Sequence, residues 1–300
     1  MLQVAFHPDY VHPIPDGHKF PMEKYQLLPE QLLYEGTLDR SHFFEPTICS
    51  EEIILTTHTS DYLNRLSELK VTPREQRVSG FVHNEQLILR EKRIMEGTRM
   101  CAEKALNCGA AMNIAGGTHH AYSDRGEGFC LLNDQAIAAN WLLNENLAKK
   151  ILIIDLDVHQ GNGTAELFRD SKDVFTFSVH GKNNYPLKKE LSHLDIELPD
   201  GTEDEAYLSS LQKNLELVLK DFTPDFIFYQ SGVDVLKTDK LGRLSLTMNG
   251  CKQRDEFVLN VVEDLGAPVV CTMGGGYSEE IKYIIEAHAN TFRAIQNILF

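Results

Sequence analysis

The sequence predicts an α/β fold in which helices cover both faces of a mostly parallel sheet, giving three layers. Short apolar runs alternate along the chain with segments of helical periodicity, which is the pattern of strands joined by helices. The run ILII at 151–154 is apolar throughout, as expected for a strand that is buried on both faces. Polar residues follow several predicted strands, and the carboxyl ends of parallel strands meet at the edge of the sheet where ligands bind.

Length and composition limit the possible classes of protein. The 300 residues are 42% hydrophobic and contain no Pro/Gly/Ser-rich linker, so we expect a single domain over residues 1–300. The net charge of -15 argues against a nucleic-acid surface, and no apolar run is long enough to span a membrane. The six cysteines form no Cys-x-x-Cys pair, which is typical of reduced thiols. We therefore expect a soluble cytoplasmic enzyme.

In the N-terminal half, elements are predicted from apolar periodicity and from residues that begin or end helices. Ser60 and Asp61 begin an amphipathic helix with leucines at every third position. Gly109 ends the longest predicted helix, as glycine commonly does. The predicted elements are strands at 2–6, 53–57 and 110–114, and helices at 22–33, 60–69 and 87–107.

The C-terminal half continues the alternation of strand and helix. Asn133 or Asp134 is expected to cap one helix, and Thr202 to Glu205 have the pattern of a capping box for another. The predicted elements are strands at 151–154, 174–179, 226–229 and 269–272, and helices at 134–144, 164–168, 202–219, 252–265 and 280–299.

The central strand is followed at once by a group of possible metal ligands. Asp155, Asp157 and His159 alternate with apolar residues, so in an extended chain all three side chains project to one side. Carboxylate oxygen and imidazole nitrogen are both good zinc ligands. The alternative is that these side chains only cap the end of the strand.

Asp234 follows a later strand and is a candidate third ligand. Gly232 stands two residues before it and allows the chain to bend. An Asp-His-Asp set would leave one or two positions open for water and substrate, as catalytic metal sites require. The alternative is that Asp234 caps a helix.

Two further motifs after predicted strands carry catalytic side chains. His119 and His120 lie on a glycine-rich loop and could divide general-base and general-acid roles, or be loop histidines without a catalytic part. Tyr277 follows three glycines and could donate a hydrogen bond to an oxyanion. These glycines are a poor phosphate loop, because no Lys-Ser/Thr follows them.

Four of these runs resemble, in order and spacing, the zinc-dependent histone deacetylase family. They are GGTHHAYSDRGEGFCLLND (116–134), IIDLDVHQGNGT (153–164), YQSGVDVL (229–236) and GGGY (274–277). Class IV members and their bacterial relatives are the most similar, through HPIPDGHKFPMEKY (12–25), GTEDEAYL (201–208) and DKLGRLSLT (239–247). The resemblance implies the arginase/deacetylase fold, with a sheet of about eight mostly parallel strands.

The activity implied by the resemblance is hydrolysis of the amide of an Nε-acyl-lysine, as a deacetylase or a longer-chain deacylase. The substrate would be an acylated lysine on a protein or peptide, or an acylated small amine. The family's cofactors would be one zinc ion per chain, with iron(II) as an alternative in the cell, and structural potassium. By matched position, the zinc ligands would be Asp157, His159 and Asp234, and the catalytic residues His119, His120, Tyr277 and Asp155, the last as the carboxylate behind His119.

The resemblance also implies residues around the catalytic centre. The acyl-lysine channel would be lined by Gly128, Phe129, His180, Tyr185 and Gly275. Potassium sites of the family use backbone and hydroxyl oxygens, which here would be those of Asp155, Asp157, His159, Ser178, Phe168 and Val174.

Three positions depart from the class I pattern. Asn162 stands where class I members carry an aspartate behind the second histidine, as in class II and IV members. Tyr185 begins Tyr-Pro-Leu, which replaces a Phe-Pro-Gly pattern on the channel wall, and residues 78–86 hold no clear equivalent of the aspartate that grips the substrate backbone.

Three alternatives stay open on sequence alone. An acetylpolyamine or other small-molecule amidohydrolase would use the same catalytic set. An arginase-type ureohydrolase needs extra carboxylates to bridge two manganese ions, and here His159 and Asp234 are followed by residues that cannot supply them. A non-catalytic module that binds acyl-lysine is less favoured, because every expected ligand and Tyr277 are present.

Overall fold

Eight parallel strands form one sheet in the computed structural model, which describes residues 1–300. Their order across the sheet is β2-β1-β3-β8-β7-β4-β5-β6, and every pair of neighbours is parallel. The predicted three-layer fold with a parallel sheet is confirmed. The strands are β1 (Gln3–Ala5), β2 (Phe43–Phe44), β3 (Ala110–Asn113), β4 (Ile151–Asp155), β5 (Val174–Gly181), β6 (Leu194–Leu198), β7 (Phe226–Gln230) and β8 (Val269–Thr272).

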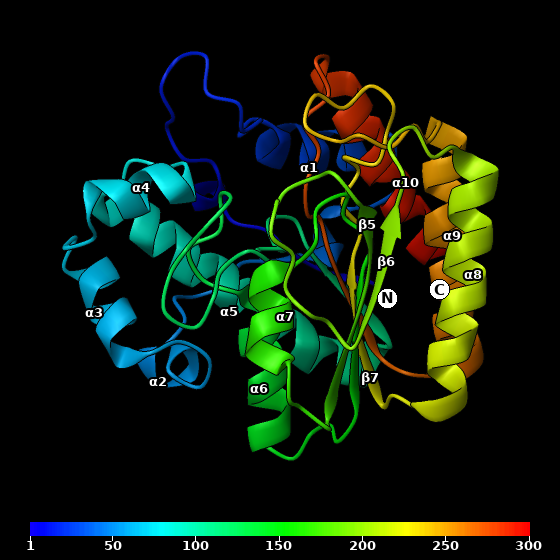
Figure 1. Ribbon diagram of the computed structural model, residues 1–300, viewed down its shortest axis with the longest axis horizontal. Helices are drawn as coiled ribbons and strands as arrows, with labels where there is room; N and C mark the ends of the chain where they lie inside the picture. Colours follow the sequence, from blue (N-terminus) through cyan, green and yellow to red (C-terminus); the bar gives the residue numbers. More distant parts are fainter.

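Helices cover both faces of this sheet. Figure 1 shows α6 and α7 on one side of the strands and α8 and α9 on the other. Helix α5 packs against α6, and α10 packs against both α9 and α1. The helices are α1 (Lys24–Tyr34), α2 (Glu51–Ile54), α3 (Ser60–Ser67), α4 (Pro73–Ser79), α5 (Glu85–Cys108), α6 (Asp134–Asn144), α7 (Asn162–Phe168), α8 (Asp204–Asp221), α9 (Met248–Leu265) and α10 (Ile281–Leu299), with short 3-10 helices η1 (Pro8–Tyr10) and η2 (Arg40–His42).

The central strand β4 shows why its sequence is apolar throughout. Ile151 and Ile153 pack in the apolar cluster on one face of the sheet, whereas Leu152 and Ile154 pack in the cluster on the other. Successive side chains of a strand point to opposite faces, so a strand between two helical layers needs an apolar residue at every position. This confirms the interpretation of the run at 151–154.

Most predicted elements are present, but the strand predicted at 53–57 is wrong. Those residues overlap the one-turn helix α2, which the Ser50 side chain caps by accepting a hydrogen bond from the N–H of Ile53 at 3.4 Å. An alternation of apolar and polar residues over only five positions does not distinguish a strand from a helical turn. Strands β2 and β6 and helix α4 were not predicted from the sequence.

The capping box predicted at 202–205 does not form. Helix α8 begins at Asp204 after an N-cap residue, Glu203, whose side chain makes no capping bond. The Thr202 hydroxyl donates to the carbonyl of Pro199 at 2.7 Å, and Asp204 accepts hydrogen bonds from Thr247. A local bond to the preceding turn therefore takes the Thr202 hydroxyl that the capping box would use, while Asp204 is engaged by a distant segment.

No helix has both the length and the apolar character that crossing a bilayer requires. All six cysteines are free thiols, and five of them are buried.

A buried ion pair in α9 ties together the strand ends that form the ligand-binding edge. Arg254 is fully buried and donates hydrogen bonds to the carbonyls of Leu156, after β4, at 3.1 Å, and of Gly232, after β7, at 2.6 Å. Its partner Asp255 also accepts from the Tyr229 hydroxyl at 2.5 Å and from Thr291 of α10 at 2.7 Å. The two strand ends are thus fixed relative to each other by one side chain.

We predict that Arg254→Met destabilises the protein by about 3–5 kcal/mol, because it leaves the Asp255 carboxylate buried without its cation. The free energy of unfolding, measured by urea titration, tests this. The control is Lys252→Met on the same helix, where a half-exposed lysine lies 3.5 Å from Glu256 and removal should cost less than about 1 kcal/mol. Equal stability of the two variants would contradict the role given to Arg254.

Candidate metal centre and catalytic site

The chain turns tightly after β4 and places three buried polar side chains in sequence. The N–H of Asp157 donates to the carboxylate of Asp155 at 3.1 Å, and the N–H of His159 donates to the carboxylate of Asp157 at 3.0 Å. These bonds hold the turn and aim Asp157 and His159 into the interior. All three side chains are buried.

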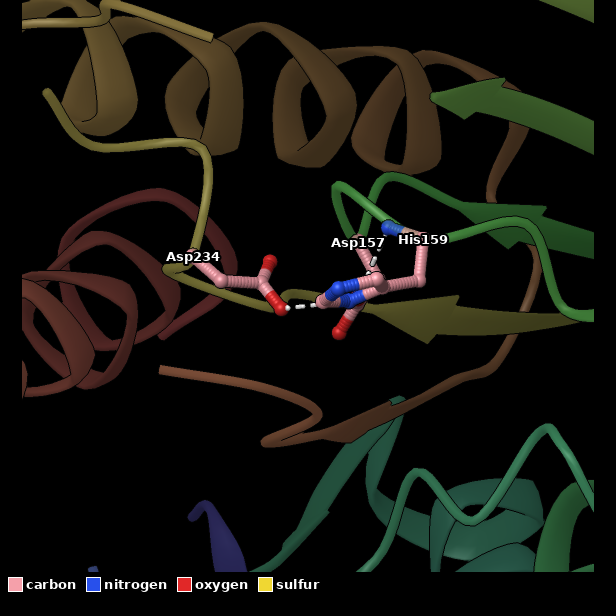
Figure 2. Close-up of side chains that lie close together, drawn as sticks. All are labelled: Asp157, His159 and Asp234. Atoms are coloured by element: carbon pink, nitrogen blue, oxygen red, sulfur yellow. Dashed lines mark hydrogen bonds and ion pairs between the residues drawn. The ribbon is translucent and has the colours of Figure 1, made fainter. Parts of the chain in front are cut away.

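Asp234 reaches the same place because β7 lies beside β4 in the sheet. One of its oxygens accepts the N–H of Val158 at 2.9 Å, and the other lies 3.1 Å from Nδ1 of His159. Nδ1 of His159 also lies 3.0 Å from a carboxylate oxygen of Asp157, so the ring stands between the two carboxylates (Figure 2). The ligand atoms of the three side chains all lie within 4.8 Å of one another.

The charges of this triad favour a cation. Burial alone would lower the pKa of His159, but the carboxylates of Asp157 and Asp234 outweigh it and raise that pKa to about 10. Burial and the neighbouring Asp157 raise the pKa of Asp234. Two carboxylates and one imidazole in a buried cluster are a donor set that fits one divalent metal ion, with zinc among the ions that prefer it.

The two adjacent histidines have different partners. Nδ1 of His119 lies 2.7 Å from the carboxylate of Asp155, whereas Nδ1 of His120 lies 2.6 Å from the side-chain oxygen of Asn162. Their ring centroids are 4.1 Å apart. Burial would lower the pKa of both rings. For His119 the carboxylates of Asp155 and then Asp157 outweigh burial and raise the pKa above its usual value. For His120, burial and the two neighbouring histidines together lower the pKa. His119 therefore binds a second ring proton more strongly than His120 does.

The glycine turn after β8 completes the site. The N–H of Gly275 donates to Asp157 at 2.7 Å, and a Cβ atom at that position would lie 2.0 Å from an oxygen of Asp234. Only glycine can approach the triad so closely. The ring of Tyr277 lies 6.3 Å from that of His159, and burial together with Asp234 and Asp157 raises the pKa of its hydroxyl, which remains a donor.

A channel leads from the surface to these side chains. Its inner part is lined by Gly275, Asp157 and the two histidines, and its outer part by Tyr185, while Gly128 and Phe129 line both. His180 differs from the expectation, because it lines neither part and is fully buried, with Nδ1 2.9 Å from the hydroxyl of Ser178. It lies within β5, where it pairs with Glu197 of β6.

The residues suggested for a monovalent cation fall into two groups. Ser178 pairs with Asp155 across β5 and β4, close to Asp157 and His159 in sequence. Val174 begins β5, four residues before Ser178, and Phe168 ends α7. Potassium at these positions stays a prediction from the sequence.

Two important residues were not identified from the sequence. Lys24 is buried in α1, and its ammonium group donates to the carbonyl of Gly274 at 2.9 Å; burial lowers its pKa to about 8 against the opposing effect of Asp234 and Asp157. Asp239 accepts the N–H of Tyr277 at 2.5 Å. Lys24 and Asp239 lie in the runs 12–25 and 239–247, which carry part of the family resemblance, but neither run assigned a role to its charged residue.

The chain matches the family described as the histone deacetylase domain over residues 18–292. An uncharacterised protein of Picosynechococcus sp. is 41% identical over 295 residues, which are 98% of this chain and 98% of that protein. Histone deacetylase 2 of Arabidopsis thaliana is 28% identical over 277 residues, covering 89% of this chain and 72% of that protein. The crystal structure of an HDAC homolog from Aquifex aeolicus is similar with a TM-score of 0.84 and 26% identity, over 99% of this chain and 83% of that one.

We predict that the metal-stripped protein binds one divalent zinc ion per chain and that binding raises the melting temperature. Mass action gives about 2.7 kcal/mol of stabilisation when free metal is at a hundred times its Kd. Asp234→Asn removes a ligand and should weaken binding by more than the roughly 10- to 100-fold that loss of an outer-shell partner costs.

Calorimetric titration and metal analysis give the stoichiometry and the affinity. Asp264→Asn, which neutralises an exposed carboxylate, is the control and should bind like the wild type. Equal affinity of the Asp234→Asn and Asp264→Asn variants would place the metal elsewhere.

Proposed function

Because the chain belongs to the histone deacetylase domain family, we propose that it is a zinc-dependent amidohydrolase that removes an acyl group from the ε-nitrogen of lysine. The observation that carries this proposal is the buried Asp157, His159 and Asp234 triad at the inner end of a channel. Two differently partnered histidines and a tyrosine hydroxyl converge on the same end of the channel. Hydrolysis of an unactivated amide requires a metal ion, a group that transfers protons and a hydrogen-bond donor to the oxyanion, and these residues can supply all three.

Asp157, His159 and Asp234 would hold the metal. When bound, a divalent ion supplies Lewis acidity, which makes a water more acidic and a carbonyl carbon more electrophilic. Gly275 contributes by letting the carboxylates of Asp234 and Asp157 pack directly against its backbone.

His120 is the residue we assign to proton transfer. Its Nδ1–H donates to the side-chain oxygen of Asn162, so Nε2 is free to accept a proton from the attacking water. When the C–N bond of the amide breaks, His120 returns this proton to the departing lysine nitrogen. His119, paired with Asp155, keeps its proton and stabilises the negative charge that develops nearby.

Tyr277 would donate its hydroxyl proton in a hydrogen bond to the oxyanion that forms as water adds to the carbonyl. The Asp239 carboxylate accepts the backbone N–H of Tyr277, and the Lys24 ammonium group donates to the carbonyl of Gly274 in the glycine turn. These bonds fix the backbone that carries Tyr277. A donor that is already in position needs no reorganisation during the reaction, which is why such groups contribute strongly to rate.

Several finer assignments remain predictions from the sequence. They are the class IV likeness, a cytoplasmic location, potassium bound by oxygens near Asp155 and Ser178, and the identity of the metal in the cell. The main alternative substrate is an acylated small amine such as an acetylpolyamine, because the catalytic groups contact only the amide that both substrates share.

The substrate prediction is that zinc-loaded protein hydrolyses an acyl-lysine peptide, and that chelated protein and Asp157→Ala do not. One peptide carrying acetyl, medium or long acyl groups is compared with acetylated polyamines, and kcat/KM is measured for each. Fastest release from a peptide supports lysine deacylation, and its dependence on chain length gives the acyl preference. Turnover of polyamines alone would replace lysine by small amines, and no turnover at all would contradict the enzyme.

Tyr277→Phe is predicted to lower kcat by about 10²- to 10³-fold with little change in KM, because the lost hydroxyl acts mainly on the oxyanion. Steady-state kinetics on the best substrate measure both constants. Tyr34→Phe, which changes a tyrosine that is 95% exposed, is the control and should leave both unchanged. A Tyr277→Phe variant with wild-type kcat would remove Tyr277 from the mechanism.

A further inference from the structure

The side-chain amide of Asn162 has two possible orientations, which differ in whether its oxygen or its NH₂ group faces His120. A carboxylate has two equivalent oxygens and so presents the same group in both orientations. The side-chain oxygen of Asn162 lies 2.6 Å from Nδ1 of His120, and the side-chain nitrogen lies 3.0 Å from the Tyr122 hydroxyl and 3.3 Å from a carboxylate oxygen of Glu127. A side-chain amide has the same shape when its oxygen and nitrogen exchange places, but donor and acceptor then exchange too. In the exchanged orientation an N–H would face His120, and the ring would have to carry its proton on the nitrogen that faces the substrate.

Both groups beyond the amide favour the same orientation. The Tyr122 hydroxyl donates to a carboxylate oxygen of Glu190 at 3.3 Å, so its oxygen accepts from the NH₂ end of Asn162. A carboxylate only accepts, so Glu127 requires the NH₂ end of Asn162 to point toward it. The oxygen end then has to face His120.

Glu127 is itself held firmly and reaches the channel wall. Its second oxygen accepts from Nε of Arg125 at 3.0 Å, and its side chain is 17% exposed. The oxygen that faces Asn162 also accepts from the Tyr185 hydroxyl at 2.5 Å. The Tyr185 ring stands edge-on to His120, with centroids 5.1 Å apart. One carboxylate therefore contacts both the residue behind His120 and the residue beside it.

We infer that Glu127 is a positioning residue that orients the Asn162 amide, fixes the proton of His120 on Nδ1 and anchors Tyr185 at the channel wall. The inference rests on the proposed function, in which His120 needs a free Nε2. In this proposal Glu127 contacts neither the substrate nor a metal ligand, but it determines whether His120 can act as a base.

The experiment exchanges the chemical roles of positions 127 and 162. In Glu127→Gln, either end of the new amide can face Asn162, so only the Tyr122 hydroxyl, through its 3.3 Å bond to Glu190, still favours the original orientation, and kcat should fall on the order of tenfold. In Asn162→Asp, two carboxylates face each other and one is displaced, so kcat should fall by a similar factor of about ten.

The double variant, Glu127→Gln with Asn162→Asp, should recover most of the lost kcat. There the glutamine NH₂ donates to the new aspartate, which can only accept from His120 and so restores the Nδ1 proton. Asp264→Asn neutralises an exposed carboxylate of α9 that makes no hydrogen bond to Arg125, Asn162 or Tyr185, and should match the wild type. Metal content and melting temperature are measured for each variant to confirm a folded, loaded protein.

A second readout does not depend on turnover. The ¹⁵N shifts of His120, assigned by difference from His120→Gln, report which ring nitrogen is protonated. We expect protonated Nδ1 in the wild type and the double variant, and a mixture of tautomers in Glu127→Gln.

Wild-type kcat in Glu127→Gln, or a double variant no better than the poorer single variant, would overturn the role of Glu127. If the wild type hydrolyses none of the substrates, the proposed function fails and the shifts alone decide the inference. An unchanged Nδ1 proton in Glu127→Gln would then refute it, and a mixture of tautomers would uphold it.

Discussion

Two carboxylates, those of Asp157 and Asp234, are buried beside each other at the edge of the sheet, and the surrounding structure offsets their charge. Burying an unpaired charge is very unfavourable, so each oxygen needs a donor or a cation. Backbone N–H groups of Val158, His159 and Gly275 donate to them, and the His159 ring stands between them. The same constraint explains why glycine is required at 275, where any side chain would displace an oxygen of Asp234.

The parallel sheet makes this concentration of charge possible. Strands β4, β7 and β8 are neighbours, so the loops after them meet although they are far apart in sequence. Arg254 fixes the first two strand ends through their carbonyl groups, and Lys24 fixes the loop after β8 in the same way. Both cations lie behind the site and act on backbone oxygens, which leaves the carboxylates free for a metal.

The catalytic centre was the most predictable part of the molecule, for a physical reason. A buried strand followed by Asp-x-Asp-x-His has a local signature, and the topology of a parallel sheet then brings Asp234 and Tyr277 to the same edge. His180 shows where such reasoning fails. Strand β5 continues to Gly181 and is covered by β6, whose sequence, LDIEL, gives too weak an apolar pattern to reveal it. A residue expected beyond the end of a strand is therefore inside the sheet.

Single hydrogen bonds between distant segments leave no pattern in one sequence. Lys24 and Gly274 are 250 residues apart, and Tyr185 and Glu127 are 58 apart, yet each pair is joined by one bond. The residues at the channel mouth lie on loops that are held by such bonds between distant segments. They include Tyr185, Arg243 and Leu187, which is 93% exposed. In the proposed reaction the catalytic groups would contact only the amide, so the choice among substrates that share it would fall to this outer wall. Local sequence patterns thus indicate the candidate metal ligands more directly than they indicate the residues of this outer wall.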